Sequence, residues 1–229
     1  MSATALSIVC LALTLFCYYA CKYLYLRHRV WWLAPIFLVP LVVIGIVALF
    51  KIDLPIYFQY THLLVMLLAP ATVAFALPIY RERALIQKYP ITIFSGVVAG
   101  LFLGMFSSWL LIKFIPLPTE LAHSFIVRSI STPFAVEATT SFGGIPELTA
   151  VMVVMTGVVG ILICEPIFKL ARIRTSLGRG VALGASAHGA GASKATEYGR
   201  EEGVVASLTM IFAGVSMVLG APFFAIFVG

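Results

Sequence analysis

The stretch LGASAHGAGASKATEYG, residues 183–199, is a polar, easily broken segment in a very apolar chain. It places a His, a Lys and a Glu in a run of Gly, Ala and Ser, and it is soon followed by residues 203–229, which carry no charge. Clustered glycines let a backbone break and approach a ligand closely. The segment therefore indicates a functional break, whose meaning depends on the solvent around the rest of the chain.

Composition indicates that this solvent is lipid. Hydrophobic residues make up 62% of the 229 residues and charged residues 10%, with a mean hydropathy of +1.08. Soluble domains carry roughly 25% charged residues, so a soluble fold could not cover this much apolar surface. The net charge of +6 does not indicate nucleic-acid binding, because Lys and Arg form short clusters between apolar runs, as loop charges do. The four cysteines form no Cys-x-x-Cys motif and are interpreted as small buried residues rather than as a disulfide or a metal site.

Six segments are long and apolar enough to cross a bilayer, at about 20 residues for each crossing helix. The expected spans are residues 2–21, 30–50, 54–80, 89–112, 148–168 and 203–229. Basic clusters follow the first, third and fifth spans, and the positive-inside rule places all three clusters on the cytoplasmic side. The sequence therefore predicts an all-α, multi-pass membrane protein with its N-terminus outside.

Two further segments must begin and end on the same side of the membrane. Residues 116–146 connect two span ends that face outside, and residues 175–202 connect two ends that face the cytoplasm. Both segments are too apolar and too rich in helix-breaking residues for ordinary loops, so they are predicted to be opposed re-entrant hairpins built from broken helices. A loop on the membrane surface, or a disordered loop, is the alternative.

A weak internal repeat accompanies the two hairpins. Gly143 aligns with Gly199 and Pro166 with Pro222 at the same offset, so each unit is a broken segment followed by a long span. The charge pattern gives the two units opposite orientations, and inverted repeats of this kind are typical of secondary transporters. The chain is accordingly interpreted as a single transmembrane domain, residues 1–229, in which residues 1–60 form N-terminal scaffold helices and residues 61–229 a transport-like core.

The broken segments carry side chains from which a binding site can be built. Interrupted helices present unpaired N–H groups and positive dipole ends, which suit a carboxylate or another small anion. Ionisable groups inside a membrane protein are costly and point to function. The predicted substrate-binding residues are Arg128, Ser131, Thr132 and Glu137 in the first segment, Ser186, His188, Ser193 and Lys194 in the second, and Thr72 in the third span, which two prolines interrupt.

Several of these features allow a second interpretation. A packing role explains His188 as well as ligand contact does, and Glu137 is expected to be a proton site or a partner of Arg128. The repeated glycines of GVVAGLFLG, residues 96–104, predict close helix contact, either within the chain or between subunits. The sequence has no Walker loop, catalytic triad or metal-ligand cluster, so neither ATP-driven transport nor an enzyme is expected.

Three blocks of the chain resemble the LrgB/CidB family of membrane proteins. They are APATVAFALPIYRER (69–83), ISTPFAVEATTSFGGIPELTAV (130–151) and LARIRTSLGRGVALGASAHGAGASKATEYGREEG (170–203). The third block departs from the family pattern, because Ala187 separates Ser186 from His188 and Ala192 stands where the family usually has Thr. The departure leaves the hydroxyl contacts of the site, and with them the substrate, open.

The resemblance implies two different functions. Bacterial members are known as antiholin-like modulators of murein hydrolase activity that act with a small LrgA/CidA-type partner, whereas plastid relatives translocate glycolate and glycerate and bacterial systems have been linked to pyruvate. The predicted hairpin site favours a self-associating transporter of small monocarboxylates in a bacterial inner membrane, working by alternating access with H⁺ or Na⁺ as a possible coupling ion. An antiholin-like regulator of cell lysis is the alternative.

Overall fold

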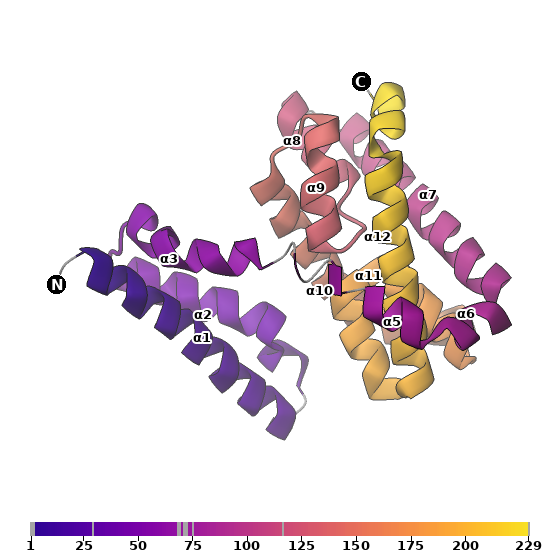
Figure 1. Cartoon of the computed structure of the whole chain (residues 1–229), viewed down its shortest axis with the longest axis horizontal. Coiled ribbons are helices and arrows are strands. Elements are labelled where there is room, and N and C mark those ends of the chain that lie inside the picture. Colours follow the sequence, from indigo (N-terminus) through magenta and orange to yellow (C-terminus); the bar gives the residue numbers. More distant parts are fainter. Residues whose placement is uncertain are drawn as a thin grey trace. The chain divides into compact units, whose positions relative to one another are not determined.

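The computed structural model describes residues 3–28, 30–67, 70, 73–74, 76–115 and 117–228. Helices dominate the described residues, and no strand occurs among them. The chain forms two compact units, Met1–Ala71 and Thr72–Gly229. Figure 1 shows both units, and each is described by itself below.

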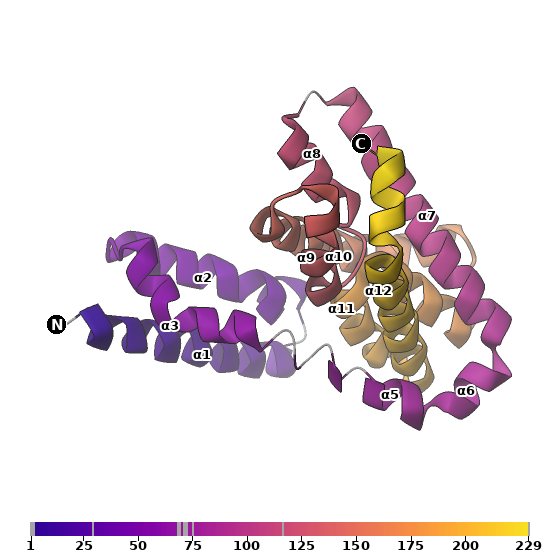
Figure 2. The same cartoon turned by 45° about the horizontal axis from the view of Figure 1, so that its top comes forward.

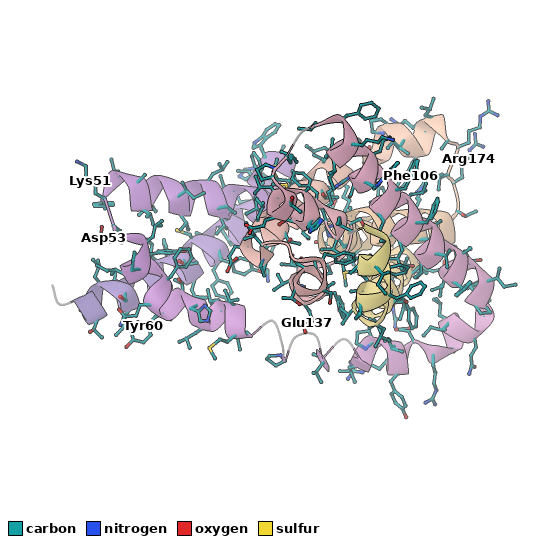
Figure 3. The ribbon with its side chains drawn as sticks, turned by 90° about the horizontal axis from the view of Figure 1, so that it is seen from above. Lys51, Asp53, Tyr60, Phe106, Glu137 and Arg174 are labelled. Atoms are coloured by element: carbon teal, nitrogen blue, oxygen red, sulfur yellow. The ribbon has the colours of Figure 1, made fainter. Side chains whose placement is uncertain are left out.

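The first unit is a small helical layer. It contains α1 (Ala3–His28), η1 (Trp31–Leu33), α2 (Pro35–Leu49) and α3 (Leu54–Met66). A proline lies in the first turn of both α2 and α3, where its missing N–H leaves no intrahelical hydrogen bond unmade. Lys51 and Asp53 lie in the turn between these two helices, as Figure 3 shows. Side-chain hydrogen bonds join α1 to α3, among them Ser7 Oγ to Gln59 Oε1 at 2.7 Å.

The second unit contains the remaining described helices and both hairpins. In chain order these are α5 (Ala76–Arg81), α6 (Arg83–Lys88), α7 (Pro90–Phe114), α8 (Thr119–Ile126), α9 (Thr132–Phe142), α10 (Pro146–Leu170), α11 (Ser176–Tyr198) and α12 (Arg200–Val228). Helix α12 is the most enclosed of the long helices. In its apolar 18-residue stretch, 56% of the residues are buried, against 11% in the corresponding stretch of α7. It contacts α11, α9 and α7, and Figure 2 shows it running through this unit.

Four described helices are long and apolar enough to cross a membrane: α1, α7, α10 and α12. This finding supports a multi-pass membrane protein, although six spans were expected. The expected second span is represented by α2, which has only 15 residues. Within the expected third span, α3 ends at Met66 and a separate helix, α5, begins at Ala76.

Helices α8 and α9 form a helical hairpin whose turn covers residues 127–131. The last turn of α8 is joined to the start of α10, because Ile145 N–H donates to Ser124 Oγ at 2.8 Å and Thr149 Oγ1 donates to the Ser124 carbonyl at 3.1 Å. Gly143 ends α9 in the left-handed region at φ 70°, a conformation that a glycine adopts without a steric penalty. We call α8, α9 and their turn the first hairpin.

Helix α11 also folds back on itself, and the break lies at His188. This residue has φ 39° and ψ −118°, which is not helical. Arg179 and Tyr198 would be about 28 Å apart in a straight helix, yet the Arg179 guanidinium lies 5.5 Å from the centre of the Tyr198 ring. The halves 176–187 and 189–198 therefore lie side by side, and we call them the second hairpin.

Glycines on α7 bring its backbone close to both hairpins. A methyl group at Gly100 would come within 2.8 Å of Ala185 Cβ, and Gly96 and Gly104 face Val181 and Ser129 at similarly close range. The glycine face of residues 96–104 is therefore occupied by contacts within the chain. The sequence predicted close helix contact at these glycines, either within the chain or between subunits, and the structure shows contact within the chain.

Candidate functional site

The turns of the two hairpins meet halfway along α10. Arg128, in the turn of the first hairpin, donates from Nη1 to Thr156 Oγ1 at 3.3 Å. At the next position of α10, Gly157 lies so close to the second hairpin that a Cβ there would be 3.3 Å from His188 Cε1. His188 also lies beside the main chain of Arg128. Two residues that are distant in sequence are thus brought together beside the centre of a long apolar helix.

Among the described residues, Arg128 is a cation that forms hydrogen bonds with neutral groups and no ion pair. Besides its bond to Thr156, it donates from Nη2 to Ser107 Oγ of α7 at 3.1 Å. The ion pairs among the described residues join Lys194 to Glu197 and Arg200 to Glu82, so no carboxylate neutralises this guanidinium there. A guanidinium held by hydroxyls alone keeps donors free for a planar anion.

Three buried polar atoms in the described part of the chain lack a hydrogen-bond partner: Arg128 Nε, Ser129 Oγ and His188 Nε2. All three belong to the two hairpin turns. Leaving a buried donor or acceptor unsatisfied costs about 1–3 kcal/mol, so native structures contain few such groups. Their concentration at one place indicates a site that exchanges hydrogen bonds with a ligand or with water.

A groove with a cavity volume of about 510 Å³ opens beside Arg128. Its walls come from α7, α8, α10 and α11, and most are aliphatic or aromatic, with Arg128, Thr156 and Ser186 as the polar groups. Small-molecule sites combine mainly apolar walls with a few convergent polar groups. The groove is therefore large enough for a small carboxylate and offers one charge and two hydroxyls to bind it.

Tyr198 fastens the open end of the second hairpin to α10. Its hydroxyl donates to Glu165 Oε1 at 3.2 Å and lies 3.8 Å from Cys164 Sγ, which also lines the groove. Arg179 and Lys194 each place a cation 5.5 Å from the centre of its ring. These contacts hold the two halves of the hairpin together at the end of the groove opposite to the turn.

The structure brings together only some of the predicted substrate-binding residues. Arg128 and His188 meet at the turns, and Ser186 lines the same groove while its hydroxyl donates to the Ala182 carbonyl. Ser131, which is buried, and Thr132 lie at the start of α9, directly after the turn. The lining of the groove includes Arg128 and Ser186 but not His188, Ser131 or Thr132.

The other predicted residues lie elsewhere or are not described. Lys194 pairs with Glu197 at 2.8 Å on the second half of the second hairpin, and Ser193 beside it is exposed. Glu137 is exposed on α9 (Figure 3), and no ion pair joins it to Arg128 within the described chain. Thr72 lies outside the described residues.

Sequence reasoning missed several residues of this site. Ser107 and Thr156, which bind Arg128, lie inside long apolar spans. A hydroxyl residue in such a span gives no sign in the sequence that it belongs to a site. Ser129 could have been found, because it follows Arg128 directly in a predicted broken segment. Cys164 and Tyr198 meet only because the second hairpin folds back onto α10.

The second hairpin, the first hairpin and the groove all lie within a region that matches a known family. Residues 14–227 match the LrgB-like family. The chain belongs to this family. The family resemblance expected from the three sequence blocks is thereby confirmed.

Relatives of this LrgB-like chain occur in Bacillus subtilis (strain 168). The uncharacterized protein YwbG is 36% identical over 218 residues, which is 95% of this chain and 97% of the relative. The uncharacterized protein YxaC is 32% identical over 215 residues, 94% of both chains. The antiholin-like protein LrgB is 31% identical over 162 residues, 71% of this chain and 70% of the relative. No solved structure matches the chain.

Proposed function

We propose that this LrgB-like membrane protein carries small monocarboxylates across the membrane by alternating access. The observation that carries the proposal is Arg128, which meets only neutral groups among the described residues at the junction of two hairpin turns. A carboxylate that reached the groove would neutralise this charge and accept two parallel hydrogen bonds from the guanidinium. Ser186 and Thr156 would hold the remaining polar atoms of a small substrate.

The proposal places six spans in the membrane, with the N-terminus outside and with both hairpins re-entrant. Its support is that the hairpins approach the middle of α10 from opposite ends. Ser124 of the first hairpin is bonded to Ile145, just before α10, whereas Tyr198 of the second is bonded to Glu165 near its other end. Helices that are interrupted at mid-membrane between inverted repeats form the substrate sites of many secondary transporters.

The proposal assigns different roles to the two compact units. Every described residue of the groove belongs to the second unit, Thr72–Gly229, which would act as the transport core. The first unit, Met1–Ala71, would act as a scaffold. The extended apolar surface of α7, where Phe94, Phe102 and Phe106 are exposed, would face lipid or a second copy of the chain in a bacterial inner membrane.

Transport by the purified protein tests this function directly. Radiolabelled glycolate, glycerate, lactate and pyruvate are offered separately to proteoliposomes, and saturable uptake of at least one is expected. Arg128→Gln should lower that uptake by about tenfold or more, because a hydrogen bond to a charged group contributes about 1.5–3 kcal/mol. The matched control is Arg174→Gln, which removes an exposed guanidinium from the turn before α11 (Figure 3). Equal loss in both variants, or saturable uptake that survives Arg128→Gln, would contradict the proposal.

A second function is favoured by the name of several relatives, which are called antiholin-like proteins. Under this alternative the chain would regulate murein hydrolase activity and cell lysis together with a small LrgA/CidA-type membrane protein. Contact with that partner would have to use a surface other than residues 96–104, because those glycines pack inside the chain. A regulator of this kind should keep its effect on lysis in Arg128→Gln cells, whereas an effect that arises from carboxylate transport should disappear.

A further inference from the structure

The backbone at His188 adopts a conformation that a histidine rarely occupies. Its φ of 39° and ψ of −118° lie close to the first central position of a type II′ turn, at about (+60°, −120°), which Gly usually fills. A glycine follows directly at position 189, where a Cβ would meet nothing within 4 Å. Strained residues of this type cluster at functional sites, because the side chain is needed where the backbone would prefer Gly.

The imidazole of His188 is enclosed by neutral surfaces and one cation. The residue is 3% exposed, and its Nε2 has no hydrogen-bond partner among the described residues. The first hairpin turn contributes Arg128, whose main chain lies against the imidazole, and α10 contributes Gly157. Just before His188, Ala185 packs against Gly100 of α7 and Gly184 against Ala206 of α12, and neither neighbour can titrate. No carboxylate of the described chain pairs with this histidine.

These surroundings make the charge of His188 depend on what occupies the groove. A protonated imidazole beside the Arg128 guanidinium would place two positive charges together in a poorly solvated site, which is unfavourable. A carboxylate bound to Arg128 removes that obstacle and supplies an opposite charge. Binding of the anion and binding of a proton to Nε2 therefore support each other, which is the linkage that cotransport requires.

We propose that His188 takes up and releases one proton for each carboxylate that the site carries, so that transport is electroneutral proton symport. The inference rests on the proposed transport function and adds its coupling ion. On one side of the membrane, Nε2 accepts a proton from water as the anion binds; on the other side, the proton returns to water as the anion leaves. The loaded and the empty site then differ by no net charge, because the proton and the anion cancel.

The test compares two activities of purified protein in proteoliposomes loaded with one transported monocarboxylate. The first is exchange of labelled for unlabelled anion without a gradient, and the second is accumulation driven by a pH gradient with the interior alkaline. The unmodified protein, His188→Gln, His188→Asn and Glu137→Gln are measured in parallel, and size-exclusion profiles establish that each is folded. Asn is included because it tolerates positive φ better than most residues.

We expect the ratio of gradient-driven accumulation to exchange to fall by about tenfold or more in both His188 variants, because neither amide side chain can carry a proton at neutral pH. The rate of exchange itself should decrease by a smaller factor than this ratio does. Glu137→Gln should retain the ratio of the unmodified protein, since Glu137 is exposed on α9. Uptake by the unmodified protein should not respond to a membrane potential set with potassium and valinomycin.

The other outcomes overturn the inference in distinguishable ways. An unchanged ratio in the His188 variants, or a fall in Glu137→Gln alone, would assign the proton to another group. Complete loss of exchange in both folded His188 variants would make the residue a binding or structural group instead. Accumulation driven by a sodium gradient would replace the proton with Na⁺. If the unmodified protein exchanged none of the four carboxylates, the proposed function itself would fail, and the coupling inference with it.

Discussion

His188 lies beside the main chain of Arg128, although each residue belongs to the turn of a different hairpin. Their junction faces Thr156 and Gly157 on α10, and the three buried polar atoms without partners in the described chain lie there as well. The contact gives the protein a polar centre within an apolar helical framework. It also makes the two hairpins interdependent, because movement of either turn would change the surroundings of the same charge.

Thr156→Val should weaken substrate binding while preserving the shape of the groove. The change removes the hydroxyl that accepts from Arg128 Nη1 but retains nearly the same volume, so the guanidinium would lose its hydrogen bond to Thr156 and keep the one to Ser107. A net hydrogen bond of about 1 kcal/mol corresponds to an increase in KM of about fivefold, with a smaller change in the maximal rate. Initial rates of uptake over a range of substrate concentrations measure both quantities.

Thr209→Val is the matched control for that substitution. Thr209 is fully buried on α12, but its hydroxyl donates only to the Val205 carbonyl of its own helix. We expect KM to stay close to that of the unmodified protein. Equal increases in KM for the two variants would mean that Thr156 does not position Arg128 for substrate.

Substitutions at His188 should separate backbone strain from side-chain function. His188→Gly relieves a strain of about 1–3 kcal/mol, whereas His188→Ala keeps the strained backbone and also loses the ring. We therefore expect the Gly variant to unfold at a higher temperature than the Ala variant in the same detergent, while both lose gradient-driven uptake. Thermal unfolding followed by circular dichroism measures the difference. An Ala variant at least as stable as the Gly variant would contradict the strained conformation.

Glycine substitutions should report the close helix contacts that hold the hairpins. At Gly160 of α10 a Cβ would come within 2.6 Å of Ala187 Cβ, so Gly160→Ala should destabilise the fold by about 1–3 kcal/mol through overpacking. Gly45→Ala is the control, because a Cβ there meets nothing within 4 Å and alanine favours a helix by about 1 kcal/mol. The two variants should therefore shift the unfolding temperature in opposite directions. A shift of the same sign would argue against tight packing at Gly160.

Cys164 can report opening of the second hairpin. It is buried in the groove beside Tyr198, and Tyr198→Phe removes the hydroxyl that bonds to Glu165. In a background where Cys10, Cys17 and Cys21 are replaced by Ala, a membrane-impermeant maleimide should label Cys164 about fivefold faster in this variant, since a net hydrogen bond contributes about 1 kcal/mol. The rate of labelling is measured by mass spectrometry.

The control for the labelling experiment is Tyr60→Phe, which changes a tyrosine of α3 in the first unit (Figure 3). Its labelling rate should equal that of the background protein. A transported carboxylate should slow labelling in the background protein, because it would occupy the groove that Cys164 lines. If neither Tyr198→Phe nor substrate changed the rate at which Cys164 is labelled, the hairpin would not open at this end.

Sequence alone determined the features that depend on local composition. The apolar runs and scarce charges indicate a multi-pass helical membrane protein, and Gly-rich sequence around His188 indicates a broken helix where the structure has one. The three sequence blocks also led to the LrgB-like family, which the match over residues 14–227 confirms. These signals are readable because helix breaking, hydropathy and motif spacing are properties of neighbouring residues.

Tertiary structure alone decided which of the polar residues belong together. It pairs Lys194 with Glu197 on the second hairpin rather than placing it beside Arg128, and it gives Arg128 two hydroxyl partners that the sequence did not indicate. It also turns the glycine face of α7 inward, toward the hairpins. These outcomes depend on how closely helices distant in sequence can approach, and that distance is set by packing between backbones, which no local pattern encodes.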